Sequence, residues 1–421
     1  MISRVVDRVI PRRLGVDFRW LISSSWVSNL GDGIAVAAGP LLVASQTKDP
    51  FLVASAALLQ RVPWLLFGLQ AGALADRLNR RVMVATVDLI RTGVLVLLCG
   101  SITTGVVNVA VVLVAMFLMG TAEVFADTTS GTLLPMVVER DDLVIGNARL
   151  QAGFLTVNQL VGPPLGAALF AAGAAWAFAS QAVLVGLGAL LVLQITAPTT
   201  VPDRGLKTRM RKDIAEGFTW VLHNAAVRTL VLTIMTFNIT FGAAMSVLVL
   251  YAEETLGLGA IGYGLLTTFT AIGGVFGTAS YGWITKRVSL GNIMRAGLII
   301  ETLTHLGLAL TTSAAVAMAI MFAFGAHAFV WGATSSTVRQ RAVPTALQGR
   351  VGSLNQIGVF GTLTVGFALG GVIAHRWGVV APFWFAFVGS AVFLVLIWGQ
   401  LSHIAHADDL SATSSPVASA P

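Results

Sequence analysis

Long apolar runs alternate with short polar joints along the whole chain. A helix that crosses a lipid bilayer needs about 20 mostly apolar residues, and a window of that length predicts twelve such helices here. They cover residues 20–44, 51–75, 82–103, 107–133, 148–172, 176–195, 229–252, 261–285, 293–312, 315–334, 349–374 and 381–401. Because the interior of a bilayer offers no water to backbone polar groups, this pattern predicts an all-α membrane protein.

One charged joint recurs at half the chain length. The sequence Gly-Ala-Leu-Ala-Asp-Arg-Leu-Asn-Arg-Arg separates the second and third predicted helices, and a weaker copy, Gly-Trp-Ile-Thr-Lys-Arg, begins 210 positions later (282 − 72). Duplication on this scale is typical of secondary transporters with two pseudo-symmetric lobes. The pattern predicts an N-terminal six-helix lobe (1–195), a cytoplasmic linker (196–228), a C-terminal six-helix lobe (229–401) and a disordered cytoplasmic tail (402–421).

The composition agrees with a membrane protein and excludes several other classes. Of 421 residues, 56% are hydrophobic and 11% are charged, whereas about a quarter of the residues of soluble domains are charged. The mean hydropathy is +0.84. The single cysteine, Cys99, excludes an intrachain disulfide and a cysteine-built metal site. The first apolar segment is too long for a cleaved signal peptide, so we expect it to remain as the first helix.

The basic residues indicate orientation. The formal charge is +7, but the lysines and arginines are scattered between apolar runs and form no single face for nucleic acid. Of the 26 basic residues, 21 lie on the amino-terminal side of the predicted membrane, 3 lie within helices and 2 lie on the far side. The positive-inside rule therefore places both termini in the cytoplasm. Part of the excess lies in the linker, which ends in apolar residues at helical spacing (Ile214, Phe218, Val221 and Leu222).

The charged turn at residues 72–81 is a candidate gate. Two lobes that close and part on the cytoplasmic side need contacts that break easily. An ion network on this turn satisfies that requirement, with bonds to the end of the fourth helix and to carbonyl groups of the other lobe. The gate residues are Gly72, Asp76, Arg77, Arg80, Arg81 and Asp127. The alternative is that these arginines only fix the topology.

Charged residues inside the predicted helices are candidates for proton coupling, because an ionised group at bilayer depth costs at least about 2.5 to 3.5 kcal/mol. Counted from the helix ends at about 1.5 Å per residue, Asp32 and Arg61 lie about 18 Å and about 21 Å deep. We expect them to pair across the first two helices. The alternative is a permanent structural ion pair. Glu123, in the fourth helix, is the rival proton carrier.

Two further pairs are expected to be structural. Asp88 and Arg91 share one face of the third helix, and Glu301 and His305 share one face of the ninth. Both spacings allow pairing within a helix.

The turn at residues 72–81 resembles the signature that the major facilitator superfamily carries between helices 2 and 3. The segment Asn-Gln-Leu-Val-Gly-Pro-Pro-Leu-Gly at residues 158–166 resembles the antiporter motif of that superfamily, which is associated with exporters, through Gly162, Pro163 and Gly166. Further matches are similar to the branch that holds enterobactin-type siderophore exporters and macrolide-type drug exporters. They include Leu134-Pro135, Gly146-Asn147-Ala148, the segment 213–217, Gln340 with Val343-Pro344, and Gly349-Arg350-Val351. The resemblance covers nearly the whole chain.

The resemblance implies a cavity lined by helices 1, 4, 7 and 10. It points Asp32 and Glu123 inward, facing Asn238, His327 and Trp331 as substrate contacts; the alternative for these three is ordinary packing and hydrogen bonding between helices. It makes helices 3 and 9 scaffold. One feature departs from the superfamily, because the fourth helix lacks the arginine that many of its proton-coupled exporters carry.

The sequence predicts a monomeric secondary transporter, and the resemblance implies that it lies in the bacterial cytoplasmic membrane. It is expected to export an amphipathic small molecule, drug-like or siderophore-like, by proton antiport, with protons and the lipid bilayer as partners and no cofactor. The chain has no zinc-binding His-Glu-x-x-His, no phosphate-binding loop and no nucleotide domain, so ATP is not expected to be the energy source. The duplication and the two motifs that resemble those of exporters predict that it is not an enzyme. The alternatives are an importer or uniporter, a polytopic membrane enzyme and, least favoured, a channel.

Overall fold

The computed structural model describes residues 12–75, 77–196, 210–344 and 347–400. Within these ranges the secondary structure consists of helices and turns. Eleven helical segments are long and apolar enough to cross a membrane, and a twelfth apolar helix, Ala381–Ile397, is shorter. The expected all-α class with up to twelve spanning helices is therefore confirmed.

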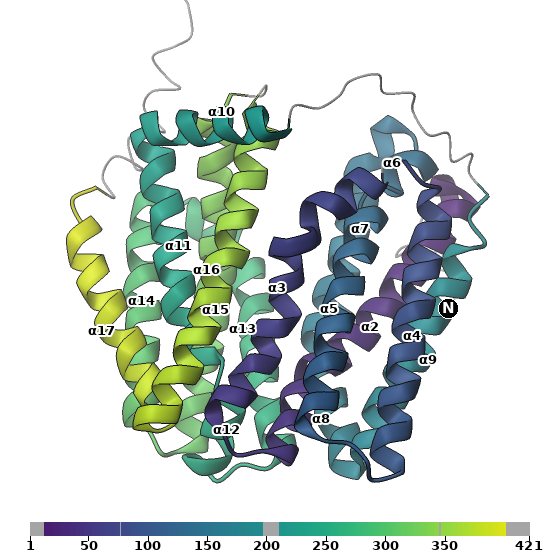
Figure 1. Cartoon of the computed structure of the whole chain (residues 1–421). Coiled ribbons are helices and arrows are strands. Elements are labelled where there is room, and N and C mark those ends of the chain that lie inside the picture. Colours follow the sequence, from purple (N-terminus) through teal and green to yellow (C-terminus); the bar gives the residue numbers. More distant parts are fainter. Residues whose placement is uncertain (1–11, 76, 197–209, 345–346, 401–421) are drawn as a thin grey trace, which may run out of the picture. The chain divides into compact units, whose positions relative to one another are not determined.

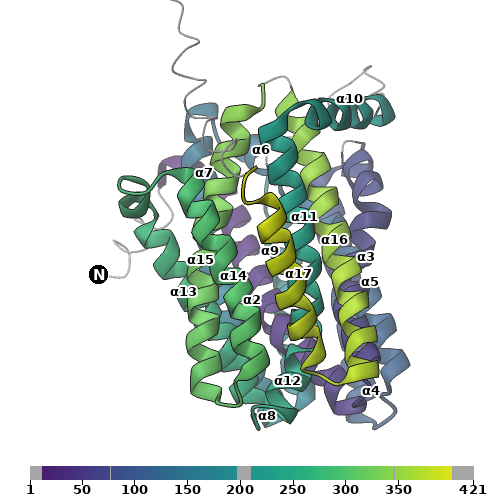
Figure 2. The same ribbon diagram turned by 90° about the vertical axis from the view of Figure 1, so that its left-hand side faces the viewer.

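The helices follow the predicted order closely (Figures 1 and 2). In the first half they are α2 (Gly15–Gln46), α3 (Pro50–Ala75), α4 (Arg80–Thr103), α5 (Val109–Ser130), α6 (Leu134–Val137), α7 (Leu143–Gly153), a π-helix (Phe154–Val161), α8 (Gly162–Ala172) and α9 (Ala174–Val192). In the second half they are α10 (Met210–His223), α11 (Ala225–Met245), α12 (Leu248–Glu254), α13 (Ala260–Thr285), α14 (Leu290–Leu310), α15 (Ala314–Ala342), α16 (Gln348–Trp377) and α17 (Ala381–Ile397).

The contacts between residues divide the chain into two compact units. The first contains the described residues up to 196 together with Val247–Thr268, and the second contains the described residues of 210–246 and 269–400. In the second unit, α11 packs on α16 and α17, and α14 packs on α15 and α17 (Figure 2). The segment Val247–Thr268 belongs to the first unit, where Lys48 Nζ and Glu253 Oε1 form an exposed ion pair at 2.5 Å.

The repeat found in the sequence is visible in the local structure. The Asn79 side chain accepts a hydrogen bond from the Val82 N–H and caps α4, and the Ser289 side chain, 210 positions later (289 − 79), caps α14 by accepting from Asn292. The turn before α9 and the turn before α17 also correspond. Each has a glycine with positive φ, Gly173 at 151° and Gly378 at 90°.

In the first unit, α2 and α8 cross with their backbones in direct contact. A Cβ atom on Gly162 would lie 2.5 Å from the Gly33 Cα, and one on Gly166 would overlap the carbonyl oxygen of Ile34. Only residues without a side chain permit this approach. We call this contact the α2/α8 crossing.

The second unit repeats the arrangement between α11 and α16. A Cβ on Gly242 would lie 2.8 Å from the Leu363 carbonyl oxygen, and one on Gly366 would lie 2.5 Å from the Ile239 carbonyl oxygen. Gly242 lies 209 positions after Gly33 (242 − 33) and Gly366 lies 204 after Gly162 (366 − 162). The α11/α16 crossing is thus the counterpart of the α2/α8 crossing.

The fifth predicted helix, 148–172, is not a uniform α-helix. It consists of α7, the π-helix Phe154–Val161 and α8, and the Gly162 N–H donates to the Val157 carbonyl five residues back. Pro163 and Pro164 follow directly; they lack N–H groups, and their rings clash with carbonyl groups of the preceding turn. A wider turn before two prolines is the kind of distortion that such a pair produces.

The helical linker segment α10 lies across one end of α11 and α16 (Figure 1). Val221 is buried in a cluster with Val227, Val231, Val343 and Val351. Phe218 and Leu222 are exposed to 51% and 44%. Val221 is therefore the residue of the predicted apolar face of the linker that packs against the second unit. The Ile214 side chain lies outside the described part. The tail 402–421 also lies outside it.

Candidate functional site

A buried ion triad joins α2 to α4 in the first unit. Arg91 donates one hydrogen bond from Nη2 to Asp32 Oδ1 and another from Nη1 to Asp88 Oδ1, the latter at 3.1 Å. The side chains of Arg91 and Asp88 are only 3% and 4% exposed, and that of Asp32 is 21% exposed. Arg91 is therefore the shared base of two acids, and its removal would leave both charges uncompensated.

The expected pair of Asp32 with Arg61 is not formed, because Arg91 takes that place. The helix α3 packs extensively on α5 and only lightly on α2, and a Cβ on Gly120 of α5 would lie 2.6 Å from the Gln60 carbonyl oxygen. This contact holds Arg61 beside α5, where its charge acts on Glu123. Within the described ranges, Arg61 has no hydrogen bond or ion pair of its own.

The expected pair of Asp88 with Arg91 is confirmed. The second bond of Arg91, to Asp32, was not predicted. A signal was present in the sequence, because three ionisable residues at mid-membrane depth (Asp32, Asp88 and Arg91) can share one network. A guanidinium group carries several donors in a planar fork, so one arginine can bind two carboxylates.

The charges of the triad extend toward α5. Glu123 interacts electrostatically with Asp32, Arg61 and Arg91, and Asp127 interacts with Glu123, Asp32, Arg91 and Asp88. The network thus holds four acids and two bases, a formal charge of −2 (2 − 4) when all six groups are ionised. An excess of acid at this depth favours the binding of protons or of other cations.

The segment that resembles the antiporter motif lies directly against this network. Gly162 contacts Gly33, the residue after Asp32, at the α2/α8 crossing. The Asn158 side chain donates to the Asn29 carbonyl oxygen at 3.2 Å, and Gln159 donates to Asn158 Oδ1 at 2.9 Å. Residues 158–166 therefore fix the part of α2 that carries Asp32.

The charged turn is described in part, because Asp76 lies outside the described residues. Arg77 is exposed. Arg80 Nε donates to the Ala75 carbonyl at 3.3 Å, and Arg81 donates to the Ile195 carbonyl. These bonds satisfy carbonyl groups at helix ends of the same unit. A Cβ on Gly72 would meet nothing within 4 Å, so in the described part no helix approaches this glycine closely.

The three expected substrate residues, Asn238, His327 and Trp331, line one cavity of about 250 Å³ in the second unit. Its other walls come from Ile234, Phe237, Phe241, Glu301, Phe324 and Ala328. Phe241 stacks on Phe324 at 5.3 Å between ring centres, and His327 meets Phe324 edge-on at 5.5 Å.

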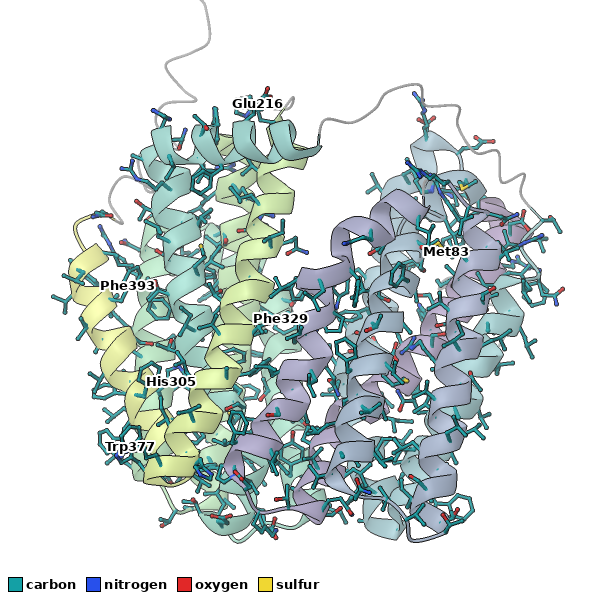
Figure 3. All side chains as sticks on the ribbon, viewed as in Figure 1. Met83, Glu216, His305, Phe329, Trp377 and Phe393 are labelled. Carbon is teal, nitrogen blue, oxygen red and sulfur yellow. The ribbon has the colours of Figure 1, made fainter. Side chains whose placement is uncertain are left out.

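Several polar atoms around this cavity have no partner. Neither ring nitrogen of His327 nor the indole nitrogen of Trp331 has a hydrogen-bond partner in the described part of the chain. The expected pair of Glu301 with His305 is not formed, since both ring nitrogens of the fully buried His305 lack a partner among the described residues. Figure 3 labels His305 within the second unit. Glu301 instead lines the cavity. No three metal-ligating side chains converge within the described residues.

The profile of the family described as transmembrane secretion effector matches residues 10–420. No curated protein sequence matches the chain. Among solved structures, the fold is similar to that of a bacterial homologue of the iron transporter ferroportin in an inward-facing state, with a TM-score of 0.71, 16% identity, and coverage of 92% of this chain and 98% of that one.

Two other transporters show the same fold. A point mutant of the nucleoside transporter NupG has a TM-score of 0.73 at 11% identity over 91% of this chain and 100% of its own. A bacterial homolog of the human lysosomal transporter Spinster, in an inward-facing and unoccupied conformation, has a TM-score of 0.68 at 14% identity over 97% of this chain and 100% of its own.

Proposed function

Because this chain belongs to the transmembrane secretion effector family and is a transporter of the major facilitator type, we propose that it exports an amphipathic small molecule from the bacterial cytoplasm by proton antiport. The observation that carries the proposal is the buried network around Arg91, in which Asp32 and Asp88 are bound to Arg91 and the charges of Glu123 and Asp127 also act on it. This network supports proton coupling, since a group that gains and loses a proton must sit where ionisation depends on its partners.

In the proposed cycle, a proton from outside binds Asp32 and breaks its bond to Arg91, which stays bound to Asp88. The neutral acid then frees α2 to move relative to α4. When the site opens toward the cytoplasm, the proton leaves and the ion pair forms again. Glu123 is the second acid of the network and the alternative carrier of the proton.

Substrate binding is assigned to the cavity of the second unit, with Asn238, His327 and Trp331 as polar contacts. The charged turn with Gly72, Asp76, Arg77, Arg80, Arg81 and Asp127 is proposed as the cytoplasmic gate. The bonds of Arg80 and Arg81 to helix-end carbonyls support a turn held firmly on its own unit. An interlobe contact of about 1 to 3 kcal/mol on such a turn is enough to shift a balanced equilibrium by one to two decades.

The test uses inverted membrane vesicles with an imposed pH gradient and a panel of drugs and siderophores. A transported compound is expected to collapse the gradient in vesicles that contain the protein and not in vesicles that contain the Asp32→Asn variant. Accumulation in whole cells that rises with expression would indicate an importer and contradict the proposal. Transport without any effect of the gradient would indicate a uniporter.

A further inference from the structure

The internal repeat relates the buried charges of the first unit to the cavity of the second. The helix caps Asn79 and Ser289 are 210 positions apart, and the same offset makes Glu301 the equivalent of Arg91 (301 − 91). Gly33 and Gly242 are 209 positions apart, and the same offset makes Phe241 the equivalent of Asp32 (241 − 32). Where the first unit has an arginine bound to an acid, the second has an acid and an aromatic ring.

Glu301 has no ion-pair partner in the described part of the chain, unlike the acids bound to Arg91. The only arginine or lysine in the described helix α14 is Arg295, and His305 on the same helix has no partner among the described residues at either ring nitrogen. The Arg295 guanidinium lies over the Trp398 ring, 5.6 Å from its centre, and donates to Asn292 Oδ1 at 3.3 Å. Glu301 is half-buried and borders the cavity. An acid without a protein partner at this place is stabilised by a bound proton when the cavity is empty, and a cationic ligand can supply the counter-charge when the cavity is occupied.

The cavity around Glu301 has the walls that an organic cation needs. Phe237, Phe241 and Phe324 offer aromatic surface, and such rings attract cations through their faces. His327, only 8% exposed, borders the same space with both ring nitrogens unpartnered. A volume of about 250 Å³ admits a molecule with one aromatic ring and a substituted ammonium group.

We propose that this cavity binds amphipathic organic cations and that Glu301 selects them by charge. The inference deepens the proposed function by assigning a substrate class to its cavity. It does not depend on antiport, because binding at equilibrium requires no proton gradient. If the vesicle assay detects no transport, binding of organic cations can still be tested. If no organic cation binds, the protein can still export another class of substrate by antiport.

The test is equilibrium dialysis of the full-length protein in lipid nanodiscs with two probes of similar size, the cation benzyltrimethylammonium and the neutral N-benzylacetamide. Glu301→Gln removes the charge and keeps the shape of the side chain. Loss of one ion pair in a partly buried site is expected to weaken binding of the cation by about tenfold or more. Binding of the neutral probe should change by less than about twofold, since no charge is involved.

The matched control is Glu254→Gln, an exposed acid at the end of α12 outside the cavity; it should change neither probe. Phe241→Leu provides an independent variant with Glu301 intact, and it should weaken the cation more than the neutral probe. Equal weakening of both probes by Glu301→Gln would reduce Glu301 to a shape role and overturn the proposal. Unchanged cation binding in that variant, or no cation binding by the unaltered protein, would also overturn it.

Discussion

The α2/α8 and α11/α16 crossings are nearly the same in shape and differ in chemistry. In both, glycines bring two backbones into contact. In the first unit the residue before Gly33 is Asp32, bound to Arg91; in the second the residue before Gly242 is Phe241, which lines a cavity. The glycine contacts between helices are therefore shared by both units, whereas the side chains beside these contacts differ in chemistry.

This comparison shows which parts of residues 158–166, the segment that resembles the antiporter motif, can indicate export. Close contact at Gly162 and Gly166 is matched at Gly366 and Gly370 in the other half, so the glycines alone do not distinguish an exporter. Within the segment 158–166 and the turn before it, the prolines Pro163 and Pro164 and the π-helix have no counterpart in α16. The direction of transport is better tested there.

The largest effect is expected from Arg91→Met. The change leaves Asp32 and Asp88 without their base, and breaking a buried ion pair costs about 3 to 5 kcal/mol of unfolding free energy. Thermal unfolding in detergent measures this loss, and pH-driven transport should disappear. Arg61→Met is the matched control, since Arg61 has no ion pair in the described part, and it should cost much less. Equal losses in the two variants would contradict the triad.

The two crossings are compared directly by Gly166→Val and Gly370→Val. Added methyl groups would overlap the facing carbonyl oxygens of Ile34 and Ala243, and overpacking of this kind costs about 1 to 3 kcal/mol. Both variants should lose stability by similar amounts, whereas Gly93→Val, with open space around its Cβ, should not. If only Gly166→Val impairs export at matched stability, the α2/α8 crossing has a role in transport beyond packing.

The proton carrier is identified by Asp32→Asn and Glu123→Gln. Asparagine can still accept a hydrogen bond from Arg91, so we expect a loss of about 1 to 3 kcal/mol or less. Export driven by a pH gradient should stop in Asp32→Asn, while substrate binding and downhill exchange continue. If that variant accumulates substrate normally and Glu123→Gln does not, the proton site lies on α5 and the triad is structural.

The smallest effect is expected from Glu253→Ala. Its ion pair with Lys48 is exposed, with side chains 48% and 58% accessible, and exposed pairs contribute about 0 to 1 kcal/mol. Urea or thermal unfolding should show almost no change, in contrast to Arg91→Met. A loss of several kcal/mol would mean that the segment Val247–Thr268 depends on this single contact.

The fold was predictable because the apolar runs have the length that a bilayer requires. The second run, expected at 51–75, is α3 at Pro50–Ala75. Two breaks were not predicted. The seventh helix ends at Met245 and resumes at Leu248, and the fifth contains a π-helix. Such breaks depend on packing between helices, which hydropathy alone does not encode.

The sequence identified the buried charged residues of the candidate site but not which of them form pairs. Depth can be counted along a helix, and it suggested Arg61 for Asp32. The direction in which a side chain points around the helix depends on which helices are neighbours, and α3 lies against α5. Arg91 on α4 therefore binds Asp32 instead. Glu301 was missed as a cavity residue for the same reason.

The assignment of Val247–Thr268 to the first unit has a consequence for synthesis. When the ribosome has released residue 196, the first unit still lacks α12 and the beginning of α13, which lie up to 72 residues further on (268 − 196). At about 5 to 20 residues per second, that interval lasts roughly 4 to 14 seconds. During it, the residues of the first unit that pack against the segment Val247–Thr268 are not yet covered by it. The first unit is therefore completed only after residues 210–246 of the second unit have been synthesised.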